Sequence, residues 1–363
     1  MQIQKLVAPI SNFFQRSKKK PAYATIERAG QSGFIYETGI SSEYHVYGFG
    51  EGPTKDSFLI GAGNPATAEG AIFIRQSTGD FRKVGLPDET AFLSQFLKLP
   101  SGKYIAGGMS AIGRGALLLG NEKASHWESA SIDLHPFSSI TALGLMPDGS
   151  VVAFAGHMIT QGKTKPVLFR SKDEGITWEK EDIKLPIGVI QSIRQSKQGS
   201  LYAGTSGDKD PMFYVSDDSA MTWRELPAFP TYKTYKMIAT YLHAEGQKDE
   251  RLFVVLWGYK TDIADRVVRI YSFTQEQNAW HEHPPVDESH FVFAFFPASD
   301  GTLYAGSEKG LIYQSTDLAN SWKKVGTFST NIGAQAFFED SNGVLWIGKD
   351  AIPPNEYGLW RKV

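Results

Sequence analysis

One short block recurs seven times along the chain and constrains the fold more than any other feature. Each copy is a turn followed by an apolar run, and the four clear copies both begin and end with glycine: Gly102–Gly107, Gly199–Gly204, Gly301–Gly306 and Gly343–Gly348. Three looser copies are Asp56–Gly61, Gly149–Phe154 and Asp249–Val254. Short units repeated at this spacing cannot each bury a face alone, so they predict stacked sheets that close into a ring.

The residues before the glycines indicate tight hairpins. Asp148-Gly149, Asp300-Gly301 and Asn342-Gly343 are dipeptides that favour the positive φ angles of a type I′ turn. The runs that follow, such as Leu201–Ala203 and Leu303–Ala305, are continuously apolar. Such runs are typical of strands that are buried on both faces, as the inner strands of stacked sheets are.

A second block, Ser-x-Asp-x-Gly-x-Thr-Trp, follows the first at a variable distance. It is complete at Ser171–Trp178 and close to complete at Ser216–Trp223 and Ser315–Trp322, where alanine replaces glycine. The Asp and Ser side chains can accept hydrogen bonds from turn N–H groups, glycine tolerates a left-handed turn residue, and Trp can fill the gap between sheets. We therefore expect a structural role for the residues of this block: Ser171, Asp173, Gly175, Trp178, Ser216, Asp218, Trp223, Ser315, Asp317 and Trp322.

This second block resembles the Asp-box, or BNR, repeat of sialidase-like β-propellers, and the resemblance extends from about Phe34 to the end of the chain. Sialidases also carry an F/Y-R-I-P element, but the nearest stretch here is Phe73-Ile74-Arg75-Gln76. Sialidases have six blades, whereas the repeats here predict seven. The chain is therefore identified as a non-sialidase member of this superfamily, and no sialidase catalytic residue is transferred to it.

Spacing and closure complete the predicted fold. The aromatic markers Phe81, Trp127, Trp178, Trp223, Trp280 and Trp322 lie about 42 to 57 residues apart, the spacing of four-stranded blades. The last unit has three strands, so we expect the isolated run Ala22–Ala29 to supply its fourth and remove an unpaired edge. The prediction is an all-β, single seven-bladed propeller over residues 22–363, preceded by a flexible basic leader at residues 1–21.

Function is expected on the face where the second-to-third strand loops and the links between blades emerge. Long loops there combine aromatic and hydrogen-bonding groups, which suits a sugar or a peptide. The ligand-binding candidates are Arg114, His157, Asp208, Tyr232, Tyr235, Tyr259 and His290. A glycosidase would need two carboxylates about 5 to 10 Å apart, for which Asp262 and Glu288 are weak candidates.

The amino-acid composition limits the classes of partner and cofactor that we expect the chain to bind. The 37 basic and 39 acidic residues give a net charge of -2, which provides no long-range attraction for nucleic acid. There are no cysteines, His281 and His283 lack a clear third metal ligand, and no dinucleotide or phosphate-binding motif is present, so we expect no cofactor. The apolar residues of the leader precede its basic run, which is the reverse of a secretory signal. We expect a soluble protein, with the cytoplasm favoured, whose leader contacts a membrane or partner weakly at most.

Two functions remain open at this point. The first is a non-catalytic binding or assembly propeller that holds a glycan or a partner-protein segment at its mouth, since single propellers of this type resemble lectin-like modules and photosystem assembly factors. The second is a glycoside hydrolase of a BNR-repeat type that uses a pair of mouth carboxylates. An acidic pair beside an aromatic platform would indicate the enzyme, and an aromatic mouth without such a pair would indicate the binding protein.

Overall fold

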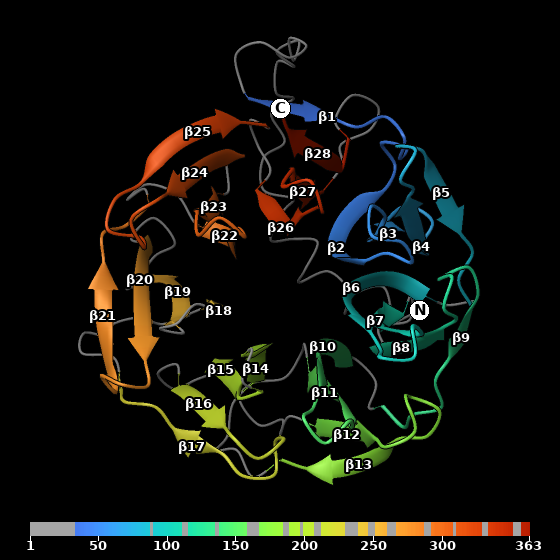
Figure 1. The fold of residues 1–363 in the computed structure, drawn as a ribbon, viewed down its shortest axis with the longest axis horizontal. Helices are drawn as coiled ribbons and strands as arrows, with labels where there is room; N and C mark the ends of the chain where they lie inside the picture. Colours follow the sequence, from blue (N-terminus) through green and yellow to red (C-terminus); the bar gives the residue numbers. More distant parts are fainter. Residues whose placement is uncertain are drawn as a thin grey trace, which may run out of the picture. The chain divides into compact units, whose positions relative to one another are not determined.

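The computed structural model describes residues 33–87, 90–110, 115–134, 138–157, 167–183, 189–196, 199–206, 212–228, 239–245, 251–259, 266–286, 292–307, 310–328, 333–350 and 357–363. These residues form seven antiparallel sheets of four strands, arranged around a centre as the blades of a β-propeller (Figure 1). The compact unit that contains them is Gln31–Val363. The predicted fold class is therefore confirmed.

Each blade runs outward from an innermost first strand. Blade 1 is β2 (His45–Glu51), β3 (Phe58–Asn64), β4 (Glu69–Arg75) and β5 (Phe81–Val84); blade 2 is β6 (Thr90–Lys98), β7 (Tyr104–Ser110), β8 (Gly115–Gly120) and β9 (Trp127–Ser129). Blade 3 is β10 (Ser138–Leu145), β11 (Val151–His157), β12 (Val167–Ser171) and β13 (Glu179–Asp182); blade 4 is β14 (Val189–Gln195), β15 (Leu201–Ser206), β16 (Met212–Ser216) and β17 (Arg224–Glu225). Blade 5 is β18 (Ala239–Glu245), β19 (Arg251–Tyr259), β20 (Arg266–Thr274) and β21 (Ala279–His283); blade 6 is β22 (Val292–Pro297), β23 (Leu303–Ser307), β24 (Leu311–Ser315) and β25 (Lys323–Thr327).

Blade 7 closes the ring with both ends of the propeller. It consists of β26 (Ala334–Glu339), β27 (Leu345–Lys349) and β28 (Leu359–Lys362), and β1 (Phe34–Tyr36) is its outermost strand. The pair β1–β28 is antiparallel, with Tyr36 opposite Trp360. Closure by an N-terminal strand is thus confirmed, but the strand differs from the predicted one: it is Phe34–Tyr36, and Ala22–Ala29 lies outside the described residues, as does the predicted leader at 1–21. Three residues are too short to show a strand pattern in the sequence.

The hydrophobic core lies between blades rather than within them. Seven buried clusters are present in the described residues, and each combines side chains of two neighbouring blades. The tryptophans of the second block pack into these seams: Trp178 against the cluster of blades 2 and 3, Trp223 against that of blades 3 and 4, and Trp322 against that of blades 5 and 6. Because every blade depends on both neighbours to bury its faces, an open array would expose two apolar faces.

The glycine that ends most copies of the first block has a packing reason. A Cβ atom at Gly61 would lie 2.1 Å from the carbonyl oxygen of Leu93, and one at Gly348 would lie 2.7 Å from Val46 Cγ1. A Cβ atom added to Gly107 would lie 2.5 Å from Ile140 Cγ2, and one added to Gly306 would lie 2.5 Å from Ala334 Cβ. In every case the obstructing atom belongs to the first strand of the next blade. The repeated glycines therefore allow neighbouring blades to approach closely at the centre of the ring.

The hairpins between first and second strands differ from the predicted type I′ turns. Gly149 N–H donates to Met146 O at 2.9 Å and Met146 N–H donates to Ser150 O at 2.8 Å, and Gly149 has φ +83°. Asp148 has no positive φ, although a type I′ turn requires one at both central residues. The loops are therefore three-residue connections in which a type I turn precedes a left-handed glycine. Ala298–Thr302 and Asp340–Val344 repeat the same bonds.

The Ser-x-Asp turns between third and fourth strands share one hydrogen-bond pattern. Ser171 Oγ donates to Asp173 at 2.8 Å and accepts from Gly175 N–H at 2.7 Å, while Asp173 accepts from both the N–H and the hydroxyl of Thr177. The Thr177 hydroxyl and N–H groups, with Ser171, lower the pKa of Asp173 to about 2. Ala220 and Ala319 take the glycine position with φ of 70° and 67°, so a left-handed alanine is accommodated there.

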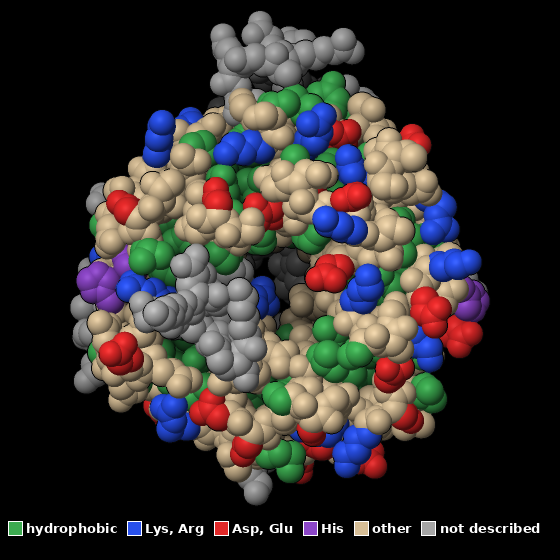
Figure 2. All heavy atoms as spheres, in the orientation of Figure 1, with side chains coloured by type: hydrophobic (Ala, Val, Ile, Leu, Met, Phe, Trp, Pro, Cys, Tyr) green, Lys and Arg blue, Asp and Glu red, His purple; other side chains and the backbone are tan. Residues whose placement is uncertain are grey.

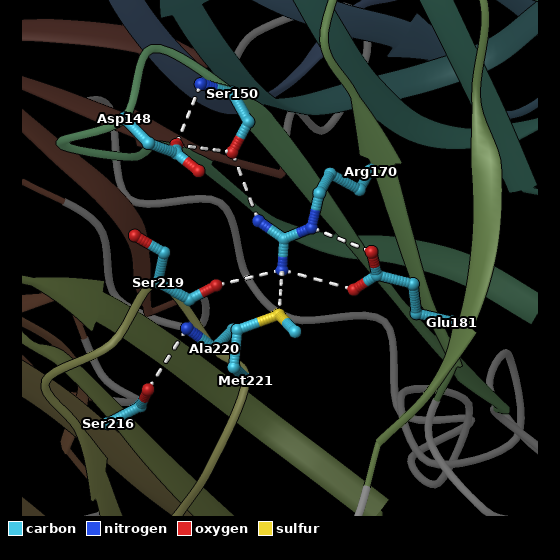
Figure 3. A network of polar contacts seen from close by, with 8 residues as sticks. All are labelled: Asp148, Ser150, Arg170, Glu181, Ser216, Ser219, Ala220 and Met221. Atoms are coloured by element: carbon cyan, nitrogen blue, oxygen red, sulfur yellow. Dashed lines mark hydrogen bonds and ion pairs between the residues drawn. The ribbon is translucent and has the colours of Figure 1, made fainter.

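A buried arginine joins blades 3 and 4 (Figure 3). Arg170 on β12 donates two hydrogen bonds to Glu181, at 2.8 and 3.0 Å, and one to Ser150 Oγ at 3.0 Å, all within blade 3. It also donates to the carbonyl oxygen of Ser219 at 2.8 Å and contacts Met221 Sδ, both in the turn of blade 4. The planar guanidinium thus fixes one blade against the next, on the side of the ring where the Ser-x-Asp turns lie.

Candidate functional site

The described polar groups with the most distinctive arrangement lie where the ring closes, between blades 7, 1 and 2. Second strands end, and first and third strands begin, on one side of the propeller, which we call the mouth face. His45 begins β2 and Asp350 directly follows β27, so both lie at this face. We call the group His45, Tyr47, Phe92 and Asp350 the seam site. Figure 2 shows that the ring is hollowed at its centre, with positive and negative side chains interspersed around it.

The centre of the seam site is a histidine–carboxylate pair. His45 Nδ1 lies 2.9 Å from Asp350 Oδ1, and the two side chains are 18% and 16% exposed. A carboxylate is only a hydrogen-bond acceptor when ionised, so a neutral His45 must carry its proton on Nδ1 to form this bond. The other ring nitrogen, Nε2, has no hydrogen bond to any described residue.

Tyr47 occupies an irregular position of its strand beside this pair. The register of β2 against β3 shifts between Val46 and Gly48, which makes Tyr47 the extra residue of a β-bulge. The same irregularity recurs in the innermost strands of blades 2, 3, 4, 6 and 7, so it belongs to the repeat, and in blade 1 it redirects Tyr47. The Tyr47 hydroxyl lies 3.4 Å from His45 Nδ1, and its ring packs on Phe92 of blade 2 with centroids 4.8 Å apart. Burial, together with the nearby Asp350 carboxylate, raises the pKa of Tyr47, so the hydroxyl stays protonated.

Lys349 is a buried lysine at a position where other blades have small residues. It pairs with Ala334 on the innermost strand, next to the bulge, and the same position is Ala62 in blade 1, Ala155 in blade 3 and Ser307 in blade 6. Its side chain is fully buried, with Nζ 5.9 Å from the ring centroids of both Phe328 and Trp360. Burying an ammonium group is costly, so this substitution within the repeat distinguishes blade 7 from the other blades, on its side toward blade 6.

A second group of aromatic rings lies on the other side of blade 7, toward blade 6. Tyr36, at the end of β1, stacks on Tyr357 with centroids 5.0 Å apart and an interplanar angle of 5°. Trp360 packs edge-on against Tyr36 at 5.5 Å. Tyr36 and Tyr357 are half-buried, which leaves part of each ring accessible at the mouth face.

Three carboxylates at the mouth ends of blades 7 and 1 each contact a basic group. Asp350 contacts His45, Glu37 accepts a hydrogen bond from Arg361, and Glu69 lies 2.5 Å from Lys83 Nζ. The Lys83 ammonium lowers the pKa of Glu69, and Lys83 also donates to the Tyr44 hydroxyl at 2.6 Å. Each of these three carboxylates therefore already has a partner within the protein.

The predicted mouth residues fall mostly outside the described ranges. This holds for the ligand-binding candidates Arg114, Asp208, Tyr232, Tyr235 and His290, and for the catalytic candidates Asp262 and Glu288. His157 and Tyr259 end β11 and β19 and so lie at the mouth face, as expected from their loops. The sequence reasoning did not select His45, Tyr47 or Asp350. One signal was present: Lys349 is a charged residue directly after the repeated glycine.

The histidines considered as metal ligands do not form a metal site among the described residues, where no three His, Asp or Glu side chains converge. His283 Nε2 pairs with Ser272 Oγ at 2.8 Å, and its ring lies 4.7 Å from that of His281. Burial and the neighbouring His281 lower the pKa of His283 to about 4.

The fold and the mouth geometry define a seven-bladed β-propeller, and comparisons with solved structures agree. The extracellular domain of a putative one-component system from B. thetaiotaomicron is similar with a TM-score of 0.64 and 14% identity over 92% of this chain, which spans 40% of that chain. The structure of YCF48 bound to D1 peptide has a TM-score of 0.62 and 12% sequence identity, and the match covers 95% of this chain and 99% of that one. A GH74 xyloglucanase from Xanthomonas campestris has a TM-score of 0.61 and 15% sequence identity. The match covers 90% of this chain and 55% of the xyloglucanase.

These likenesses concern the fold alone, because all are at or below 15% identity. No protein-family model matches the chain, and no curated sequence is significantly similar to it. Within the described ranges, no helix has the length and hydropathy that a membrane span requires.

Proposed function

We propose that this protein is a non-catalytic binding propeller that holds a glycan or a segment of a partner protein at its mouth face. The observation that carries the proposal is the pairing of the three carboxylates at the closing seam with His45, Arg361 and Lys83. A glycosidase acts through two carboxylates of which at least one must be free to accept or donate a proton. Paired carboxylates beside aromatic rings suit recognition better than acid catalysis.

The fold neighbours are compatible with this proposal. One of them is a sensor's extracellular domain and another is bound to a peptide, according to their descriptions. We also propose membership of the Asp-box superfamily, supported by the shared hydrogen bonds of the three Ser-x-Asp turns. In that classification the turns are structural, and recognition belongs to the opposite, mouth face.

The test is a binding screen of the purified protein on a glycan array, together with a pull-down from a lysate analysed by mass spectrometry. We expect capture of one glycan class or one protein partner without any turnover. Release of reducing sugar from a polysaccharide, lost on changing Asp262 or Glu288 to Ala, would instead establish the glycoside hydrolase. The glycoside hydrolase is kept as the alternative because the GH74 xyloglucanase is similar in fold to this chain.

A further inference from the structure

We propose that His45 is the group of the seam site that contacts the ligand, and that the ligand is a neutral glycan with adjacent hydroxyl groups. This inference rests on the proposed function and specifies its ligand class. In this site His45 Nε2 accepts a hydrogen bond from one hydroxyl, the Tyr47 hydroxyl donates to a neighbouring oxygen, and the aromatic rings contact the apolar face of the sugar. Each element follows from the contacts of the described residues.

The first element is the tautomer of His45. Asp350 Oδ1 lies 2.9 Å from Nδ1, so the neutral ring keeps its proton there and leaves a lone pair on Nε2. Nε2 has no partner among the described residues, although the ring is only 18% exposed. A partly buried acceptor held in a fixed orientation is well suited to bind one donor of a ligand.

The second element is the proton of Tyr47. His45 Nδ1 carries one hydrogen, and the shorter contact shows that Asp350 receives it, so Nδ1 has no lone pair for the hydroxyl 3.4 Å away. The Tyr47 proton is therefore available to a ligand. An acceptor and a donor side by side match the two adjacent hydroxyl groups of a sugar, each of which both donates and accepts.

The third element is charge. Three described carboxylates at this part of the mouth each have a partner: Asp350 contacts His45, Glu37 pairs with Arg361 and Glu69 pairs with Lys83. The tilted Tyr47–Phe92 rings add apolar surface beside His45. A neutral sugar needs only hydrogen bonds and an aromatic face, and it does not compete with Arg361 or Lys83 for these paired carboxylates. The geometry thus favours the glycan over the peptide.

The inference is tested with neutral cello-, xylo-, manno- and malto-oligosaccharides, with sialylated and uronate-containing glycans printed beside them. Calorimetry then measures the affinity of the best neutral ligand for the full-length protein and its variants. We expect His45→Phe and Tyr47→Phe each to weaken binding roughly tenfold or more, because each removes one hydrogen bond to the sugar and keeps a ring. Asp182→Asn, an exposed position at the mouth end of β13 in blade 3 and outside the seam site, is the control and should bind like the wild type.

A spectroscopic measurement separates positioning from folding. Imidazole ¹⁵N shifts of the wild type should place the His45 proton on Nδ1, and Asp350→Leu should reduce that tautomer and weaken binding together. A proton on Nε2 in the wild type overturns the inference even if a variant fails to fold.

The remaining outcomes distinguish the inference from the proposed function. Unchanged glycan affinity in His45→Phe, or binding of charged glycans only, refutes the inference and leaves the binding propeller intact. Capture of a protein segment in place of any glycan does the same. If the wild-type protein binds neither a glycan nor a protein, both the inference and the proposed function are refuted.

Discussion

The buried arginine between blades 3 and 4 permits a quantitative test of how the ring is held together. Arg170 is 4% exposed and its partner Glu181 is 29% exposed. Arg170→Met removes two charge-assisted bonds to Glu181 and single bonds to Ser150 and the Ser219 carbonyl. Breaking a buried pair from one side costs about 3 to 5 kcal/mol, and partial hydration of Glu181 brings the expected loss to the lower end, about 3 kcal/mol.

The chain offers a matched control in blade 5. Arg269 and Glu282 form the same pair between third and fourth strands at 3.1 Å, but they are 37% and 45% exposed. Such exposed pairs contribute about 0 to 1 kcal/mol, so Arg269→Met should cost less than about 1 kcal/mol. Urea unfolding followed by tryptophan fluorescence gives both values from the midpoint and slope.

Two results would contradict this reasoning. Equal losses for Arg170→Met and Arg269→Met would show that burial and the contacts to blade 4 add nothing. A slope that changes in the Arg170 variant alone would indicate separate unfolding of blades rather than a loss of overall stability. The double variant Arg170→Met, Glu181→Leu should recover part of the loss, because no buried charge then lacks a partner.

Two further predictions concern blades 5 and 3. The pKa of His283 is about 4 in the folded protein and 6.5 when unfolded, so the unfolded chain binds the proton first and stability falls as pH drops from 6.5 toward 4. Between pH 7 and 5 the wild type should lose on the order of 2 kcal/mol more than His283→Phe, measured by urea midpoints at both pH values; parallel pH profiles would disprove the assignment. Gly175→Ala should destabilise by about 1 to 3 kcal/mol, because its Cβ would lie 2.8 Å from Ile105 Cδ1 at φ +88°. Ala220→Gly, at the same turn position of blade 4, is the control and should change the melting temperature little. An unchanged stability of Gly175→Ala would show that the packing between blades 2 and 3 adjusts to the added methyl group.

The sequence by itself determined the number of blades and their internal order. Repetition of the glycine-bounded strand is local information, and seven copies at blade spacing leave few alternatives. The predicted turn type was wrong because Asp148-Gly149 is compatible with both a two-residue and a three-residue loop, and the pairing of the flanking strands selects between them. The closing strand was misplaced because Phe34–Tyr36 acquires its role only from pairing with β28.

The seam site was decided by the tertiary structure. His45 and Asp350 are separated by 305 positions in the chain and meet only because the last blade packs against the first. Neither residue has a local pattern that marks it, since a histidine at a strand start and an aspartate in a loop are ordinary surface residues. Repeated short-range contacts specify a blade, but a site made of side chains from the first and last blades exists only once the ring has closed.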